Sequence, residues 1–236
     1  MAAIGSTTKT RIGTANPKLE MNMQLSQFID HTLLSPTATP RAIEKLCEEA
    51  VEHQFYAVCV NSGYVHLAAN ILKYERVLVA ATVGFPLGAM ATEAKLFEAT
   101  HCIGQGANEI DMVLNLGALK SGLVKSVREE IAAVKKAIGK NVLKVIIETC
   151  YLTDTEKILA CELVEKAGAD FVKTSTGFGS GGATIKDIEL IKGTVGPQTK
   201  IKASGGIKTG KEALEYIAMG VSRIGTSNGI QLIKTQ

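Results

Sequence analysis

Long apolar runs are missing from the sequence, since none reaches the roughly 20 residues that a membrane-spanning helix requires. The N-terminus also lacks the apolar stretch of about 7 to 15 residues that marks a secretory signal peptide. A strong excess of one charge is absent as well, because 26 lysines and arginines face 23 acids, for a net charge of +3. Evenly spread charge of this size does not indicate a nucleic-acid partner. We therefore expect a cytoplasmic protein that binds neither membranes nor nucleic acids.

Cysteine and histidine patterns typical of disulfide scaffolds and zinc sites are missing too. The five cysteines are odd in number, well separated and never spaced as C-x-x-C, which favours a reducing compartment. The four histidines also lack ligand spacing, so a structural zinc site is not expected. The positions concerned are Cys47, Cys59, Cys102, Cys150, Cys161, His31, His53, His66 and His101.

The N-terminal segment differs from the rest of the sequence. Residues 1–18 contain serine, threonine, lysine and arginine but no acid, and show little apolar periodicity. We expect residues 1–24 to form a disordered extension, with a transit peptide as the alternative. Residues 25–236 contain no linker or break in composition. With 46% hydrophobic and 21% charged residues in the whole chain, they are interpreted as one globular domain.

Strand-like and helical patterns alternate from about Met23 onward, at a pitch of roughly 25 to 30 residues. Thr39 followed by Pro40 predicts the start of one of the intervening helices. Eight such units predict an α/β fold, specifically a single-domain (β/α)8 TIM barrel, with a doubly wound sheet as the alternative. The expected strands span 29–32, 56–60, 77–83, 109–115, 141–148, 170–175, 200–205 and 222–227.

Charged residues stand inside several of these strands. Lys173 and Lys202 each precede a glycine-rich turn, and a lysine is a poor residue for a strand interior. A single such lysine is best explained by a side chain that reaches outward past a helix. However, Lys144 lies in a third strand, and Asp111 and Asp30 lie in two others. We expect these five side chains to meet inside the barrel near the carboxyl ends of the strands, where active sites of this fold lie.

A cluster of lysines predicts amine chemistry. Free lysine has a pKa of about 10.4, and a neighbouring ammonium together with partial desolvation lowers that value. One lysine of the pair Lys173 and Lys202 would then form a Schiff base, and the other would act on it electrostatically. Because an imine is an electron sink, the expected reaction makes or breaks a carbon–carbon bond beside a carbonyl. Asp111 would transfer protons, directly or through water.

Glycine-containing turns after the seventh and eighth expected strands indicate a phosphate site. Gly205 and Gly206 precede a helix near Thr209, and Gly225 and Ser227 precede the final helix. Backbone amides in such turns bind phosphate, and this barrel often places a phosphate after its seventh and eighth strands. The expected substrate is a small phosphorylated aldehyde or sugar.

The segment GFGSGG at residues 177–182 also fits the G-x-G-x-x-G pattern of dinucleotide-binding loops. That interpretation requires an acid about 20 residues later, at the end of the next strand. Here the next strand reads KIKASG and contains lysines, and the motif follows the sixth strand instead of the first. We therefore do not expect dinucleotide binding.

Five motifs occur together and in order: ATVGFPLG, EIDMVLN, LKVIIET, FVKTSTGF and KASGGI. From about Leu25 to Ile233 the sequence resembles the deoxyribose-phosphate aldolases, which are class I aldolases with a (β/α)8 fold. The resemblance implies reversible cleavage of 2-deoxy-D-ribose 5-phosphate into D-glyceraldehyde 3-phosphate and acetaldehyde, without metal or other cofactor, in deoxyribose phosphate catabolism. The expected assembly is a homodimer or a homotetramer. Another sugar-phosphate aldolase, a transaldolase and a non-enzymatic phosphosugar-binding barrel are the alternatives.

The resemblance also implies roles for individual residues. Lys173 corresponds to the Schiff-base lysine, Lys202 to the second lysine that lowers its pKa, and Asp111 to the acid of the proton relay. No chemistry is assigned to His31, and none to Cys59 beyond a place in the pocket. Some members of the family continue into a mobile C-terminal tail, whereas this sequence stops at Gln236. The residues implied to line the pocket are Asp30, Thr32, Cys59 and Lys144, and those implied to bind phosphate are Gly177, Gly205, Gly206, Gly225 and Ser227.

Overall fold

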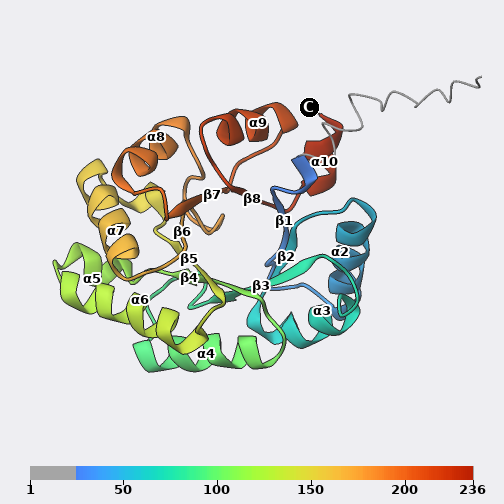
Figure 1. The fold of residues 1–236 in the computed structure, drawn as a ribbon, viewed down its shortest axis with the longest axis horizontal. Coiled ribbons are helices and arrows are strands. Elements are labelled where there is room, and N and C mark those ends of the chain that lie inside the picture. Colours follow the sequence, from blue (N-terminus) through green and yellow to red (C-terminus); the bar gives the residue numbers. More distant parts are fainter. Residues whose placement is uncertain (1–24, 236) are drawn as a thin grey trace, which may run out of the picture.

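A computed structural model describes residues 25–235 of the chain, so the expected disordered extension over residues 1–24 lies outside the described residues. Eight parallel strands form a closed barrel in which each strand pairs with the next in sequence and the last pairs with the first (Figure 1). The predicted (β/α)8 TIM barrel is confirmed. The strands are β1 (Ile29–Leu33), β2 (Ala57–Val60), β3 (Leu78–Val83), β4 (Glu109–Val113), β5 (Val142–Ile146), β6 (Phe171–Lys173), β7 (Lys200–Ser204) and β8 (Arg223–Thr226).

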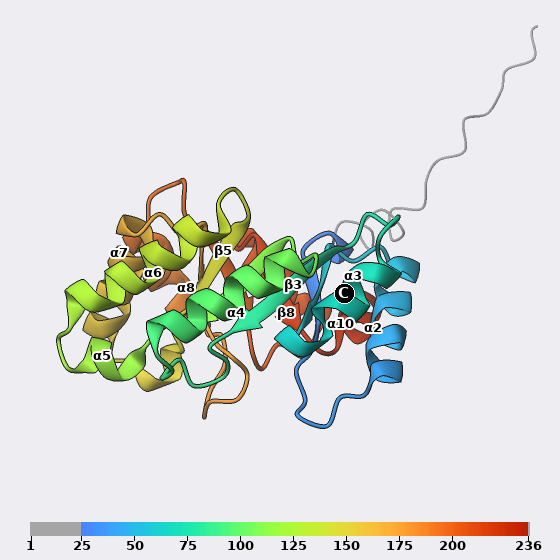
Figure 2. The same ribbon diagram turned by 90° about the horizontal axis from the view of Figure 1, so that it is seen from below.

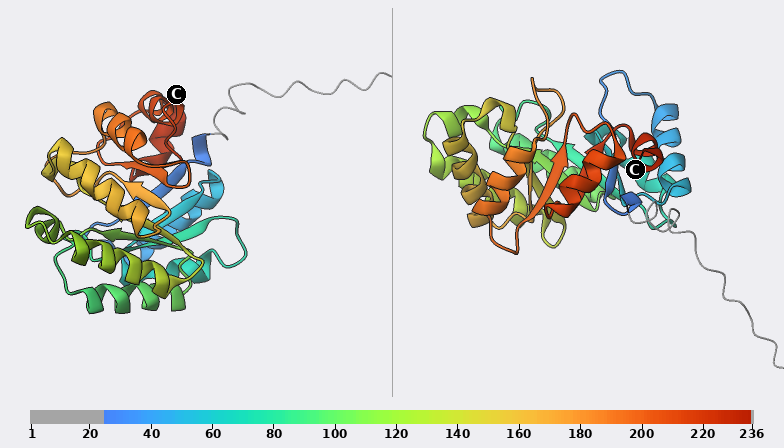
Figure 3. Two further views of the ribbon diagram at one scale, coloured as in Figure 1. Left: turned by 60° about the vertical axis from the view of Figure 1, so that its left-hand side comes forward. Right: turned by 90° about the horizontal axis from the view of Figure 1, so that it is seen from above.

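Helices surround the barrel and cover the outer face of the strands (Figures 2 and 3). No helix within residues 25–235 is long and apolar enough to cross a membrane. The helices are α2 (Pro40–Glu52), α3 (Val65–Ile71), α4 (Thr92–Gly104), α5 (Leu116–Lys120), α6 (Val124–Ile138), α7 (Asp154–Lys166), α8 (Ile185–Thr194), α9 (Gly210–Ala218) and α10 (Gly229–Lys234). Two short 3-10 helices, Ser62–Tyr64 and Thr149–Tyr151, follow β2 and β5.

Capping residues define several helix starts. Thr39 accepts a hydrogen bond from the amide of Ala42, and Pro40 is the first residue of α2, as the sequence predicts. A threonine and a glutamate three residues later form a capping box at the start of α7 and of α9. Helix α5 is an addition that the sequence pattern did not predict. It is only 5 residues long, too short to show a helical period, and it begins after the capping side chain of Asn115.

The two faces of the strands bury different kinds of side chain. Outward side chains such as Ile110, Met112, Leu143 and Val172 are fully buried against the helices. Side chains between them in sequence point to the opposite face, because direction alternates along a strand. That face lines the inside of the barrel, where Asp111 and its cationic neighbours lie.

Several strands are shorter than predicted. The expected strand 170–175 ends at Lys173, and the expected strand 141–148 ends at Ile146. Glu148 has a φ of 49°, a left-handed conformation that no continuing strand adopts. The chain therefore turns out of the sheet at this point, and the segments after β5 and β6 become loops at the mouth of the barrel.

Candidate active site

Asp111 is the centre of a charged cluster inside the barrel. Its Oδ2 atom accepts hydrogen bonds from Lys173 Nζ and Lys202 Nζ, both at 2.8 Å. Its Oδ1 atom accepts one from Lys144 Nζ at 2.7 Å. The three lysines come from the consecutive strands β5, β6 and β7, whose register sets them beside Asp111 on β4. The structure thus brings together the side chains that the sequence pattern placed on the inner face.

A second set of charges lies beside the first. Lys202 pairs with Asp30, and Arg223 Nη1 lies 2.6 Å from Asp30 Oδ1. Arg223 Nη2 is 2.8 Å from Glu109 Oε1, while Glu109 Oε2 is 2.5 Å from Lys144 Nζ. Sequence reasoning assigned no role to Glu109 or Arg223. The alternation of side chains along a strand could have identified Glu109, because it stands two residues before Asp111 and therefore shares its face of β4.

The charges of this cluster do not cancel when every group is ionised. It contains four cations, Lys144, Lys173, Lys202 and Arg223, against three carboxylates, Asp30, Glu109 and Asp111. A surplus charge is expensive in this place, because the cluster is almost completely removed from solvent. Lys144 and Lys202 have no exposed surface, whereas Lys173 is 3% exposed.

Neighbouring charges determine the ionisation of the cluster. Burial raises the pKa of Asp111, but the three surrounding ammonium groups outweigh burial and hold this pKa well below its ordinary value of 3.8. The pKa of Asp30 is lowered in the same way by Lys202, Lys144 and Arg223. Burial lowers the pKa of Lys202, but Asp111 and Asp30 outweigh it and raise the pKa above 10.5. Asp30 and Asp111 are therefore ionised, and Lys202 is protonated, at neutral pH.

These shifts predict how stability depends on pH. Asp30 and Asp111 have folded-state pKa values below 3.8, so their contribution is complete above that pH and is lost as pH falls below it. The urea unfolding midpoint of the parent protein should therefore fall steeply from about pH 4 to about pH 2. An Asp30→Asn variant has one such group fewer and should show a shallower fall. If the unfolding midpoint falls equally steeply with pH in the two proteins, Asp30 does not have the lowered pKa described above.

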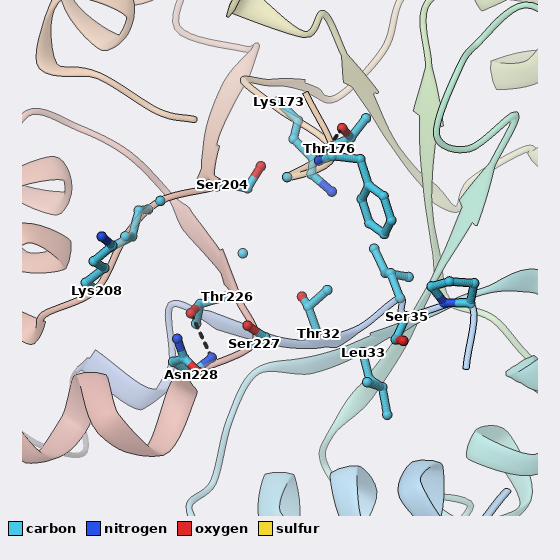
Figure 4. A pocket seen from close by; sticks show the side chains of 18 residues that line it. Thr32, Leu33, Ser35, Lys173, Thr176, Ser204, Lys208, Thr226, Ser227 and Asn228 are labelled. Atoms are coloured by element: carbon cyan, nitrogen blue, oxygen red, sulfur yellow. Dashed lines mark hydrogen bonds between the residues drawn. The ribbon is translucent and has the colours of Figure 1, made fainter. Parts of the chain in front are cut away.

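A cavity of about 550 Å³ opens above the cluster, at the carboxyl ends of the strands. Lys173 lies in its wall, and Figure 4 shows Lys173 and Thr176 on one side with Thr226, Ser227 and Asn228 on the other. The cavity is also lined by the expected residues Thr32, Gly177, Gly205, Gly206 and Gly225.

The remaining expected site residues do not line the cavity. Lys202, Lys144, Asp111 and Asp30 belong to the buried cluster. Cys59 is also fully buried, with its Sγ atom 4.0 Å from Asp111 Oδ2. Burial and the negative charge of Asp111 raise the pKa of the Cys59 thiol, so this thiol is protonated at neutral pH.

The glycine turn after β7 offers free donors to the cavity. Gly205 and Gly206 have φ values of 82° and 76°, which favour glycine at both positions. Within the described part of the chain, their backbone amides donate to no acceptor. Lys208, which sequence reasoning missed, is exposed at the same rim and adds a positive charge (Figure 4). Consecutive free amides next to a lysine are suited to bind an anion.

Gly225 has a second constraint besides its place in the cavity wall. A Cβ atom at this position would lie 2.9 Å from Ser204 Cβ and 3.0 Å from Lys202 Cε. The missing side chain therefore makes room for Lys202. The glycine-rich segment 177–182 also serves packing, because a Cβ atom on Gly182 would lie 2.2 Å from Gly205 O.

Side chains that could hold a metal ion are not gathered anywhere in residues 25–235, where no three of His, Cys, Asp and Glu are grouped suitably. The ionised groups of the site instead pair with each other. The arrangement can present an amine to a carbonyl compound, hold a negative charge beside that amine, and bind an anion at the rim of the same cavity.

A family model described as DeoC/LacD family aldolase matches residues 25–230 of the chain. A deoxyribose-phosphate aldolase of Brevibacillus brevis is 53% identical over 211 residues, which cover 89% of this chain and 96% of the relative. A deoxyribose-phosphate aldolase of Thermococcus gammatolerans is 52% identical over 219 residues, which cover 91% of this chain and 97% of the relative.

Solved structures show the same similarity. The tetrameric deoxyribose phosphate aldolase of Aeropyrum pernix matches with a TM-score of 0.84 and 30% identity, covering 94% of this chain and 97% of that chain. A structure named QR15, an aldolase, matches with a TM-score of 0.86 and 40% identity, covering 89% of this chain and 94% of that chain.

Proposed function

The chain belongs to the DeoC/LacD family of aldolases, and we propose that it cleaves 2-deoxy-D-ribose 5-phosphate reversibly into D-glyceraldehyde 3-phosphate and acetaldehyde. One observation carries this proposal. Of the three lysines that contact Asp111, Lys173 alone lines the cavity. An amine held beside a carboxylate in the wall of an open pocket can meet a substrate carbonyl.

The first step is attack by the neutral amine of Lys173 on the C1 aldehyde of the open-chain sugar. Loss of one proton from Lys173 leaves three cations against three carboxylates, which removes the surplus charge of the cluster. Loss of water from the carbinolamine then gives a protonated Schiff base. Asp111 lies 2.8 Å from Lys173 Nζ and can accept or return the protons of these steps, directly or through a water molecule.

Cleavage breaks the bond between C2 and C3 of the sugar. The C3 hydroxyl loses its proton, C3 becomes the aldehyde of glyceraldehyde 3-phosphate, and the bonding electron pair moves into the Schiff base to form an enamine. A proton added at C2 and hydrolysis of the resulting imine then release acetaldehyde and restore Lys173. Lys202 remains protonated beside Asp111, so it supplies a fixed positive charge next to the reacting nitrogen.

The phosphate of the substrate fits the rim of the cavity. Gly205 and Gly206 offer backbone amides, Ser227 offers an exposed hydroxyl and amide, and Lys208 offers a positive charge. Gly177 and Gly225 line the same cavity, and a Cβ atom on Gly177 would meet no other atom within 4 Å. Thr32, whose hydroxyl donates to Asp30 O at 2.8 Å, presents the rest of its side chain to the same space (Figure 4).

The function is tested by measuring acetaldehyde release from 2-deoxyribose 5-phosphate and from unphosphorylated 2-deoxyribose. The phosphorylated sugar should have the higher kcat/KM by at least about 100-fold, because two or more charge-assisted hydrogen bonds are lost without the phosphate. A transaldolase would release no acetaldehyde, and a binding protein would turn over neither sugar. Either result would overturn the proposal.

We propose further that the chain forms a homodimer or a homotetramer. The tetrameric relative from Aeropyrum pernix supports an assembly of identical subunits. The five cysteines are all free thiols, which suits the reducing cytoplasm as the place of action. Light scattering of the purified protein tests the assembly, and a mass equal to that of one chain would exclude it.

A further inference from the structure

Glu148 is a buried carboxylate at the mouth of the barrel to which the proposed reaction gives no role. It is 2% exposed and follows β5 by two residues. None of the cationic side chains in residues 25–235 lies within salt-bridge distance of it. Its φ of 49° is uncommon for a residue with a side chain, and such backbone conformations concentrate at functional sites. A buried, unpaired carboxylate requires strong hydrogen bonds from its surroundings.

Thr176 supplies those hydrogen bonds. Its backbone amide donates to both carboxylate oxygens of Glu148, at 3.2 and 3.3 Å, and its hydroxyl donates to Oε2. The hydroxyl oxygen in turn accepts a hydrogen bond from the amide of Phe178 at 3.0 Å. Glu148 therefore fixes both donors of Thr176 directly and the backbone of Phe178 through Thr176.

The segment held in this way is one wall of the active-site cavity. Thr176, Gly177 and Phe178 all line it, and the segment begins three residues after Lys173. The ring of Phe178 makes an edge contact with Phe85, with ring centroids 5.3 Å apart. We call residues 176–178 the cavity wall segment.

The chain after the wall segment packs directly on Glu148. A Cβ atom on Gly179 would lie 3.2 Å from Glu148 Cδ and 2.7 Å from Cys150 Sγ. Farther on, the amide of Ala183 donates to Gly205 O at 3.1 Å. The loop after β6 is thus fastened to the end of β5 on one side and to the glycine turn after β7 on the other. Loss of the Glu148 contacts would free the wall segment while leaving the attachment to Gly205.

We propose that Glu148 is a positioning residue that sets the affinity for the sugar phosphate by holding the cavity wall segment. It acts through Thr176 and takes no part in the proton transfers at Lys173. This inference rests on the proposed aldolase function.

The proposal is tested with Glu148→Gln, which keeps the size of the side chain. An amide has one acceptor oxygen where the carboxylate has two, and it carries no negative charge. It therefore cannot accept every hydrogen bond that Thr176 donates to Glu148, and those that remain are not charge-assisted. Loss of one charge-assisted hydrogen bond predicts a KM for 2-deoxyribose 5-phosphate about ten-fold higher, with kcat changed by less than about two-fold. Trapping of acetaldehyde on Lys173 by borohydride should proceed at the parent rate, because the Glu148 side chain contacts Thr176 and not Lys173.

A matched control and a coupled variant separate positioning from a general loss of structure. Glu165→Gln removes a carboxylate that accepts the amide of Gly196 at 2.7 Å, beside the start of β7 at the opposite end of the barrel, and should leave KM unchanged. Thr176→Val should raise KM like Glu148→Gln, and the double variant should raise it no further.

An unchanged KM in folded Glu148→Gln, or fully multiplicative effects in the double variant, would overturn the proposal. Slowed acetaldehyde trapping in Glu148→Gln would overturn it too, because Glu148 would then act on the Schiff base itself. If the chain is not an aldolase, the outcome is different, because the parent protein itself would then neither trap acetaldehyde nor turn over the sugar phosphate.

Discussion

Asp111→Asn should destabilise the protein by about 3–5 kcal/mol and lower kcat by about 10²–10⁴-fold. Asp111 is fully buried and accepts hydrogen bonds from Lys144, Lys173 and Lys202. An uncharged amide there would leave three ammonium groups with too little negative charge, and it could not transfer protons. Urea unfolding followed by circular dichroism gives the change in stability, and steady-state kinetics give the change in kcat.

Asp154→Asn is the matched control for this substitution. Asp154 also contacts two lysines, Lys157 and Lys186, at 3.4 and 2.6 Å. It is exposed, however, and exposed ion pairs contribute only about 0–1 kcal/mol. The control should therefore keep both stability and activity. If Asp111→Asn proves no less stable than Asp154→Asn, the cluster does not depend on Asp111 as described.

Lys202→Met should lower kcat by about 10³-fold while the protein remains folded. Lys202 has no exposed surface and does not line the cavity, so it is not expected to form the Schiff base itself. The contribution that we propose for it is a permanent positive charge 2.8 Å from Asp111 Oδ2, the oxygen that also contacts Lys173. Methionine fills a similar volume without that charge. The measurement is kcat, together with the rate at which borohydride traps acetaldehyde on Lys173.

Lys95→Met provides the comparison. Lys95 is also fully buried, but it lies on α4 outside the barrel, 2.6 Å from Glu130 Oε1. The same substitution there removes a buried ion pair without touching the cavity. It should lower stability and leave kcat near the parent value. Equal kcat in Lys202→Met and Lys95→Met would show that the charge of Lys202 has no part in the reaction.

Alternation along the strands was sufficient to predict that Lys144, Lys173, Lys202, Asp111 and Asp30 meet in the buried cluster, although Glu109 and Arg223 were missed. Lys144, Lys173, Lys202 and Asp111 each occupy an inward position, and a closed barrel leaves their side chains no other space. Alternation does not give depth within the barrel. It therefore could not show that Lys173 borders the cavity while Lys202 and Lys144 lie beneath it, since depth depends on the register between strands.

Two features that sequence reasoning missed, the place of Arg223 in the cluster and the contacts of Glu148, depend on contacts between distant segments. Arg223 joins the cluster because β8 closes against β1, which brings it to Asp30. Glu148 was expected to be a strand residue, but its left-handed backbone turns the chain toward Thr176. No local sequence pattern predicts the position of Arg223 or the contact of Glu148 with Thr176, because both result from packing between strands and loops that are far apart in the sequence.

The assignment of Lys173 is the central claim, and chemical trapping tests it most directly. The protein is incubated with acetaldehyde and sodium borohydride, digested, and its peptides are analysed by mass spectrometry. We expect one ethyl group on Lys173, and no labelling in a folded Lys173→Met variant. An ethyl group on Lys202 or Lys144 instead, or none on the folded parent protein, would contradict the assignment of Lys173 as the Schiff-base residue.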